Sequence, residues 1–295
     1  MKNIILLYFL GFTTAFAQIG LEDQYQLNML SLNPAFTGER GNFGVSGLLG
    51  QQFNGTFTPN QISQLISMDG KLGEGKSALG FQGFRSNITG FTNNGMTLSY
   101  NYFLPLNDKL RVNLGINAGF MISPNFIGNV DILQRFNPFG GPGAAVFSET
   151  AFLGIAAPTL LGNSDIYSTL NKNVKITGGY RFGTYENIGI NLSGLASLAT
   201  RSSDDNGFDI NLKIWLGNKI GLGGSYRTQS GFSKVIPSLQ MRASETSTIG
   251  LSYDAQPLLF TNRNTGSVTP RGVFQLLYRY DVFNLGEKSP FLNQF

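Results

Sequence analysis

Hydrophobic and polar residues alternate along much of this chain. From 110 to 120, every even-numbered residue is apolar and every odd-numbered residue is polar or glycine. Because successive side chains of a β-strand point to opposite faces, such a segment has one hydrophobic and one hydrophilic face. The same pattern predicts fourteen strands, at 43–53, 61–71, 77–86, 95–104, 109–121, 141–147, 150–157, 173–182, 187–196, 207–216, 218–228, 233–242, 246–254 and 271–282.

The connections between these segments carry a second signal. Every second connection is tight, namely 72–76, 105–108, 148–149, 183–186, Gly217 and 243–245. The intervening connections are mostly longer, and three are expected to be long loops, at 122–140, 158–172 and 255–270. A barrel in an outer membrane sorts its connections in this way, with short periplasmic turns and long extracellular loops. We therefore predict an all-β, antiparallel transmembrane β-barrel of about 14 strands, closed so that no sheet edge faces lipid.

The composition agrees with a membrane barrel. Charged residues make up 13% of the chain, about half of the ~25% found in ordinary soluble domains. Glycine is frequent at 38 residues, and phenylalanine contributes 25, yet the mean hydropathy is only -0.02. Hydrophobicity hidden by alternation is typical of such barrels, so outer-membrane lipid is the expected surrounding. The net charge of +4 is diffuse and includes no basic run, which gives no indication of a nucleic-acid partner.

The first residues predict export. Lys2 precedes an apolar run at 4–12, and Ala15-Phe16-Ala17 has the small-residue spacing of a cleavage site. The domain organisation that follows is a signal peptide at 1–17, a periplasmic N-terminal segment at 18–42, the barrel at 43–283 and a C-terminal tail at 284–295. The predicted location is the cell outer membrane.

Several kinds of chemistry are absent. The chain has no histidine and no cysteine, which excludes His-based triads, cysteine nucleophiles and the usual zinc sites. We therefore predict no enzyme activity, no cofactor and no metal. The acidic cluster Asp204, Asp205 and Asp209 lacks the spacing of a calcium loop and is interpreted as a solvated loop. The run 140–143 is interpreted as a flexible loop end.

Charged residues on the hydrophilic strand faces allow two interpretations. They either line an open pore or pair across a filled lumen, since a polar interior is expected in both cases. These residues are Arg111, Lys213, Arg227 and Arg279, set against Asp209 and Asp281.

The segment before the first strand is the most specific in the chain. Gln24-Tyr25-Gln26-Leu27-Asn28 is followed by Asn33-Pro34-Ala35-Phe36-Thr37-Gly38. The second element reads as a rigid turn, because asparagine bonds its own backbone, proline fixes φ and glycine permits a positive φ. The pair resembles the N-terminal signature of the PorP/SprF family of type IX secretion system outer-membrane proteins of Bacteroidota. The predicted structural or partner-docking motif consists of Tyr25, Asn28, Asn33, Pro34, Ala35 and Gly38.

The resemblance implies a role in secretion or in surface attachment of cargo proteins such as adhesins, in some members linked to gliding motility. Its implied partners are periplasmic or peptidoglycan-linked secretion components and a secreted cargo. On this interpretation the long loops receive the cargo at the cell surface, and 18–42 docks the periplasmic machinery. Two alternatives remain open, a passive channel or small-solute transporter and a purely structural surface barrel.

Overall fold

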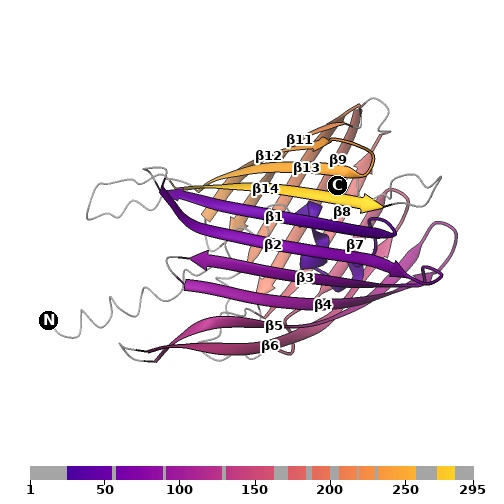
Figure 1. Cartoon of the computed structure of the whole chain (residues 1–295). Coiled ribbons are helices and arrows are strands. Elements are labelled where there is room, and N and C mark those ends of the chain that lie inside the picture. Colours follow the sequence, from indigo (N-terminus) through magenta and orange to yellow (C-terminus); the bar gives the residue numbers. More distant parts are fainter. Residues whose placement is uncertain are drawn as a thin grey trace.

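In the computed structural model the chain forms a closed barrel of fourteen antiparallel strands (Figure 1). The first strand pairs with both the second and the last strand, which closes the ring. The predicted fold class is thereby confirmed. The structure describes residues 25–54, 58–88, 91–127, 131–162, 172–183, 188–199, 206–217, 219–229, 232–256 and 271–282. No helix in these ranges is long and apolar enough to cross a membrane.

The strands follow one another around the ring in chain order. Their bounds are β1 Phe43–Asn54, β2 Thr58–Leu72, β3 Ser77–Ile88, β4 Phe91–Pro105, β5 Arg111–Ile127, β6 Asp131–Phe147, β7 Ala151–Ala156, β8 Asn173–Phe182, β9 Ile188–Ala199, β10 Gly207–Leu216, β11 Ile220–Gln229, β12 Phe232–Arg242, β13 Ser247–Gln256 and β14 Arg271–Val282.

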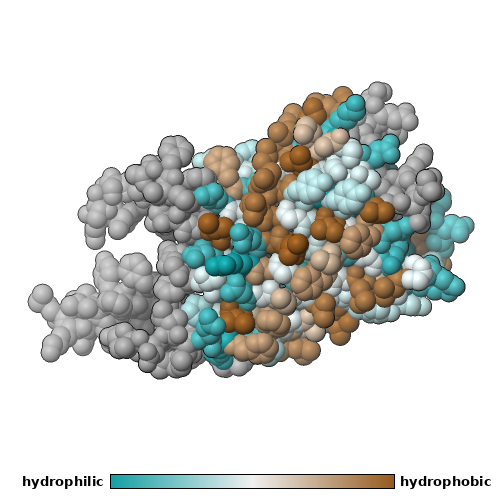
Figure 2. All heavy atoms as spheres, viewed as in Figure 1, coloured by the Kyte–Doolittle hydropathy of each residue, from teal (hydrophilic) through white to brown (hydrophobic). Residues whose placement is uncertain are grey.

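The alternation puts apolar side chains outside the barrel and polar side chains inside it. In β10, Phe208 and Ile210 are 52% and 58% exposed, whereas Asp209 and Lys213 are 3% and 1% exposed. Figure 2 shows the outside of one face, where hydrophobic side chains form a band and hydrophilic ones gather toward the two ends. An apolar exterior around a polar interior suits a barrel surrounded by hydrocarbon.

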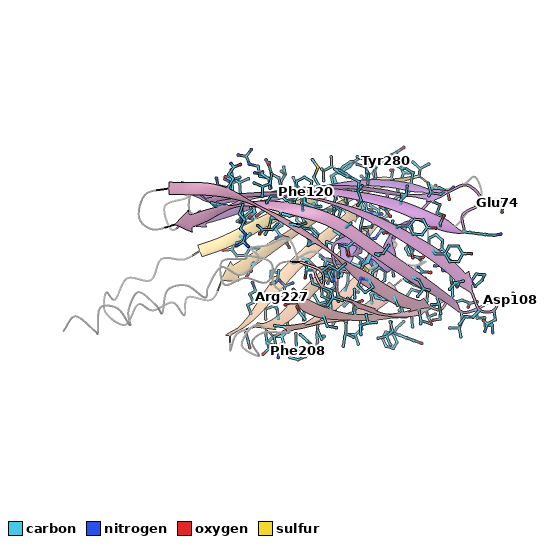
Figure 3. All side chains as sticks on the ribbon, turned by 90° about the horizontal axis from the view of Figure 1, so that it is seen from below. Glu74, Asp108, Phe120, Phe208, Arg227 and Tyr280 are labelled. Carbon is cyan, nitrogen blue, oxygen red and sulfur yellow. The ribbon has the colours of Figure 1, made fainter. Side chains whose placement is uncertain are left out.

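The connections that follow even-numbered strands are all short and lie at one end, here called the short-turn end. Glu74, between β2 and β3, and Asp108, between β4 and β5, lie together there in Figure 3. The opposite end, here called the long-loop end, holds the connections 157–172 and 257–270, close to two predicted long loops. The expectation that most connections there are longer is wrong, because 55–57, 89–90, 128–130 and 230–231 are as short as the turns.

The predicted long loop at 122–140 is also wrong, because β5 and β6 pair continuously from Arg111↔Phe147 to Ile127↔Asp131. Pro138 and Pro142 obscure β6 in the sequence, since proline cannot donate to a strand ladder. In the structure the Pro142 oxygen accepts a hydrogen bond from the Ala157 nitrogen at 2.9 Å, on the side away from β5. Pro138 has the same parity along the strand. The backbone nitrogens of both prolines therefore point away from β5, so no ladder bond to β5 is lost. The run 140–143, predicted as a loop end, is part of this strand.

Candidate functional site

The described chain begins inside the barrel. Residues 25–42, here called the plug, contain the 3-10 turns η1 Tyr25–Leu27, η2 Met29–Ser31 and η3 Pro34–Phe36. Figure 1 shows this indigo segment within the ring of strands. From Tyr25 to Gly41 every residue except Ser31 is buried. The sequence predicts that 18–42 faces the periplasm, but its described part fills the lumen, where the hydrophilic inner strand faces supply partners; 18–24 lie outside the described residues.

The plug contains the turn that the sequence predicts. The Asn33 side-chain oxygen accepts a hydrogen bond from the Ala35 nitrogen at 2.9 Å and thereby caps η3. Pro34 occupies the first position of η3, where its missing N–H costs nothing. The Thr37 hydroxyl donates to the Pro34 oxygen at 2.8 Å. Gly38 then turns the chain at a φ of +74°, which other residues rarely adopt.

Inward-facing glycines form a recess for this turn. A Cβ added at Gly115 of β5 would lie 2.3 Å from the Ala35 nitrogen, and one at Gly143 of β6 would lie 2.1 Å from the Asn33 side-chain oxygen. These two glycines are direct partners across the β5–β6 ladder. The Asn33 amide nitrogen also donates to the Ala144 and Ile155 oxygens at 3.1 and 3.3 Å. The turn thus sits against the wall so closely that no side chain fits beneath it.

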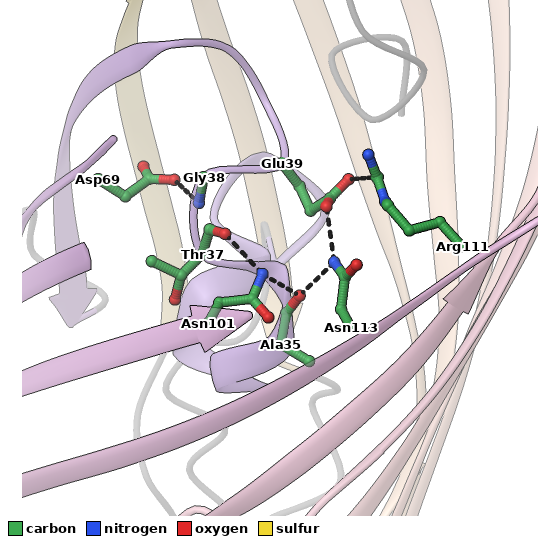
Figure 4. Close-up of polar contacts among 8 residues, drawn as sticks. All are labelled: Ala35, Thr37, Gly38, Glu39, Asp69, Asn101, Arg111 and Asn113. Carbon is green, nitrogen blue, oxygen red and sulfur yellow. Dashed lines mark hydrogen bonds and ion pairs between the residues drawn. The ribbon is translucent and has the colours of Figure 1, made fainter. Parts of the chain in front are cut away.

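Two inward asparagines beside this recess also hold the plug. Asn101 of β4 donates to the oxygens of Ala35 and Thr37 at 3.0 and 2.9 Å. Asn113 of β5 donates to the Ala35 oxygen at 2.9 Å and to Glu39 at 2.6 Å. Figure 4 shows how these bonds converge on the last turn of the plug.

Charged groups fix the end of the plug that leads into β1. The Glu39 carboxylate lies 2.5 Å from the Arg111 guanidinium, and the Gly38 nitrogen donates to Asp69 at 2.7 Å. Burial raises the pKa of the Glu39 carboxyl, while the neighbouring Arg111 charge opposes that shift. Arg40 is also buried, and burial lowers its pKa, with Arg279 acting in the same direction.

The beginning of the plug contacts the far wall. The Tyr25 hydroxyl donates to Asp209 of β10 at 3.1 Å, and Asp209 is also paired with Arg227 at 2.8 Å. Burial raises the pKa of the Tyr25 phenol, so this hydroxyl stays protonated and remains a donor. The Asn28 side-chain oxygen accepts from Ser67 and Gln82, both at 3.3 Å.

Apolar plug residues occupy three small hydrophobic sites in the lumen; the third is formed by Tyr25 and Leu32 of the plug with Leu195 of β9. Leu27 packs against three inward leucines, and the Phe36 ring meets two inward phenylalanine rings edge to face with centroids 5.5 and 5.6 Å apart. The wall residues are Leu48, Leu65 and Leu277 for the first site and Phe147 and Phe152 for the second.

Every residue of the predicted motif therefore lies in the plug and is buried. The sequence motif missed Glu39 and the wall asparagines Asn101 and Asn113. Glu39 could have been identified from the sequence, because it is a carboxylate directly after the predicted turn. Asn101 and Asn113 could not, because in the sequence they resemble the other polar residues that face the lumen. Of the charged residues with two interpretations, Arg111 pairs with Glu39 and Arg279 with Asp281. Of these pairs, Arg111–Glu39 joins the wall to the plug, whereas Arg279–Asp281 lies within β14 and Asp209–Arg227 joins the neighbouring strands β10 and β11. The contacts favour paired charges beside a filled lumen over an open, charge-lined pore.

No group of metal-ligating residues is found within the part of the chain that the structure describes. Asp204 and Asp205 of the acidic cluster lie outside that part. Asp209, the third member, is engaged by Tyr25 and Arg227.

Comparison with known proteins identifies the family. A family model described as "Type IX secretion system membrane protein PorP/SprF" matches residues 15–280. No curated protein sequence matches the chain. Among solved structures, Omp33 of Acinetobacter baumannii is 12% identical with a TM-score of 0.53, covering 83% of this chain and 100% of its own. The CymD monoaromatic hydrocarbon channel is 12% identical with a TM-score of 0.52, covering 91% and 94%. These likenesses show an outer-membrane barrel fold, and the chain belongs to the PorP/SprF family of type IX secretion system membrane proteins.

Proposed function

We propose that this outer-membrane barrel assists the secretion or surface attachment of a cargo protein, such as an adhesin, without catalysing a reaction. The observation that carries the proposal is the filled lumen. The plug forms hydrogen bonds with eight strands, β2 to β7, β10 and β14, so its contacts extend across the interior. A barrel closed in this way is suited to work through its exposed ends. Gliding motility is one process that such cargo serves.

The cargo is expected to meet the barrel at the long-loop end, which we assign to the cell surface. The two long connections there, 157–172 and 257–270, offer the most chain for binding a folded domain. The short-turn end would then face the periplasm. Because the described plug residues are buried, periplasmic or peptidoglycan-linked secretion components are expected to contact the short turns rather than the plug motif.

A passive channel is the second candidate function. The structural likeness to CymD concerns the fold alone, since the identity is 12%. Fourteen strands enclose a lumen between the filled 8-stranded barrels and the open ones of about 16 strands. The plug occupies that lumen, which favours the secretion role over conduction.

Replacement of the long loops tests the proposal. Residues 163–171 or 258–269 are exchanged for a short Gly/Ser linker, with the same exchange at 243–246 of the short-turn end as the matched control. We expect surface cargo to be lost in the loop variants and kept in the control, while all barrels retain their heat-modifiable migration on gels. Unchanged display of cargo in both loop variants would refute the proposal.

Purification of the tagged protein from native outer membranes tests the partners separately. Mass spectrometry should identify periplasmic secretion components and one large surface protein. A barrel that is purified alone, and that conducts ions in a bilayer, would favour the channel.

A further inference from the structure

The outer wall carries an unusual charge. Arg85 of β3 is exposed and points outward. Among the described side chains that point outward from the strands, it is the one that carries a charge. Arg85 makes no hydrogen bond or ion pair with another residue of the described part of the chain. A charge on the lipid face of a barrel is unfavourable by about 2–4 kcal/mol at mid-bilayer and by about 0–1 kcal/mol near the interface. An anionic group at the boundary between the barrel and the lipid would offset this cost.

Arg85 borders an open groove in the outer wall with a volume of about 500 Å³. The floor of the groove is one row of residues in register across four strands: Tyr278, Gly47, Ile66 and Gly83. Large side chains thus alternate with glycines. A Cβ added at Gly47 would meet nothing within 4 Å, so packing within the chain does not require glycine there. Its missing side chain leaves the space in front of the wall empty.

The adjacent row changes from apolar to polar along the same four strands. Leu276 and Leu49 are 44% and 54% exposed, and they are followed in register by Gln64 and Arg85, which are also exposed. This second row lies nearer the long-loop end, because β3 runs from the short turn at 73–76 toward Ile88. The groove therefore joins an apolar floor, deeper in the membrane, to a guanidinium and an amide nearer the surface.

We propose that this groove binds a lipid with an anionic phosphate headgroup, drawn from the leaflet at the long-loop end. The Arg85 guanidinium would hold two phosphate oxygens, a geometry that its planar fork favours, and the Gln64 amide would donate a third hydrogen bond. An acyl chain of the lipid would lie along Gly47 and Gly83, where no side chain competes for the space. Charge complementarity at one end and empty apolar surface at the other select this amphiphile over a free anion. The site is independent of the secretion role.

Native mass spectrometry of the whole barrel in detergent tests the site. The probe is dipalmitoyl phosphatidic acid, compared with dipalmitoylglycerol, which has the same chains without phosphate, and with inorganic phosphate. We expect one phosphatidic acid to be retained per barrel, dipalmitoylglycerol to be retained about tenfold less, and inorganic phosphate not to displace the lipid. Displacement by inorganic phosphate would reduce the site to a simple anion site and overturn the proposal.

Three variants separate the two ends of the groove. Arg85→Gln should lower lipid occupancy about tenfold, and Arg85→Lys should lose less because the charge remains. Gly47→Leu should fill the groove and lower occupancy, whereas Gly194→Leu, on the outward face of β9, should leave it unchanged. A Cβ at Gly194 meets only the Asp209 oxygen at 3.5 Å, so this control is expected to fold. Equal occupancy in Arg85→Gln and the wild type, or in Gly47→Leu and Gly194→Leu, would overturn the proposal.

Discussion

Replacement of Asn113 by leucine should loosen the plug without breaking the barrel wall. The two side chains are similar in size, but leucine cannot donate the bonds from Asn113 to the Ala35 oxygen at 2.9 Å and to Glu39 at 2.6 Å. Both acceptors belong to the plug. The substitution therefore removes plug contacts and leaves the backbone ladder of β5 in place.

The loss of plug-docking free energy depends on which other hydrogen bonds the two acceptors retain. A neutral hydrogen bond contributes about 1 kcal/mol and one to a charged group about 1.5–3 kcal/mol. The Ala35 oxygen retains its bond from Asn101, and Glu39 retains Arg111, so the lower end of the combined range applies. We expect a loss of about 2 kcal/mol, which raises the population of the undocked plug about 30-fold.

The absence of native cysteine makes this population measurable. Thr37→Cys, nearly isosteric at a fully buried position, introduces a single thiol into the plug. When opening and closing are fast, the rate at which a maleimide reagent modifies this thiol is proportional to the undocked population. In the Thr37→Cys background, Asn113→Leu should therefore raise the labelling rate about 30-fold.

Asn211→Leu is the matched control. Asn211 is an inward asparagine, 3% exposed, whose amide donates to Ser225 of the neighbouring strand at 2.8 Å. Its replacement should leave the labelling rate at position 37 unchanged. If both variants changed that rate equally, or if Asn113→Leu left it unchanged, the proposed attachment of the plug through Asn113 would be refuted.

Three further substitutions test other plug contacts. Gly115→Leu should lower the melting temperature in detergent well below that of Gly194→Leu, because its Cβ would overlap the plug backbone; equal values would contradict the close fit. Tyr25→Phe should cost about 1.5 kcal/mol in denaturant unfolding, the lower end for a hydrogen bond to a charged group, since Asp209 keeps Arg227. Burial raises the pKa of Glu39 in the folded protein, so the folded state binds this proton more tightly than the unfolded state does. The resulting gain in the free energy of unfolding is complete below the ordinary pKa of 4.5 and is lost as pH rises through the raised pKa. The wild type should therefore lose stability relative to Glu39→Gln as pH rises, and a constant difference would contradict the shift.

The barrel itself was predictable because its strands obey a period of two. Residues 208–214 alternate without interruption, and that regularity is what lipid outside and a polar lumen inside require. The prediction failed at β6 because Pro138 and Pro142 are poor strand residues when read alone. Their tolerance depends on facing away from β5, which only the paired structure reveals.

The plug was recognisable only as a motif. The sequence indicates the turn at Asn33, Pro34 and Gly38 from local backbone chemistry, but nothing local says which surface covers it. Its location in the lumen depends on Gly115 and Asn113, which are far along the chain and resemble ordinary positions of an amphipathic strand. The contacts between the plug and the wall join distant segments and follow no repeating pattern, so they could not be predicted from the sequence.

The most direct test of a closed, plugged barrel is single-channel recording of the purified protein in a planar bilayer. The plug should keep the wild type nearly silent, and Gly115→Leu, which leaves it no room, should produce conducting events. Stable conductance of the wild type, at the level of the displaced-plug variant, would contradict the account.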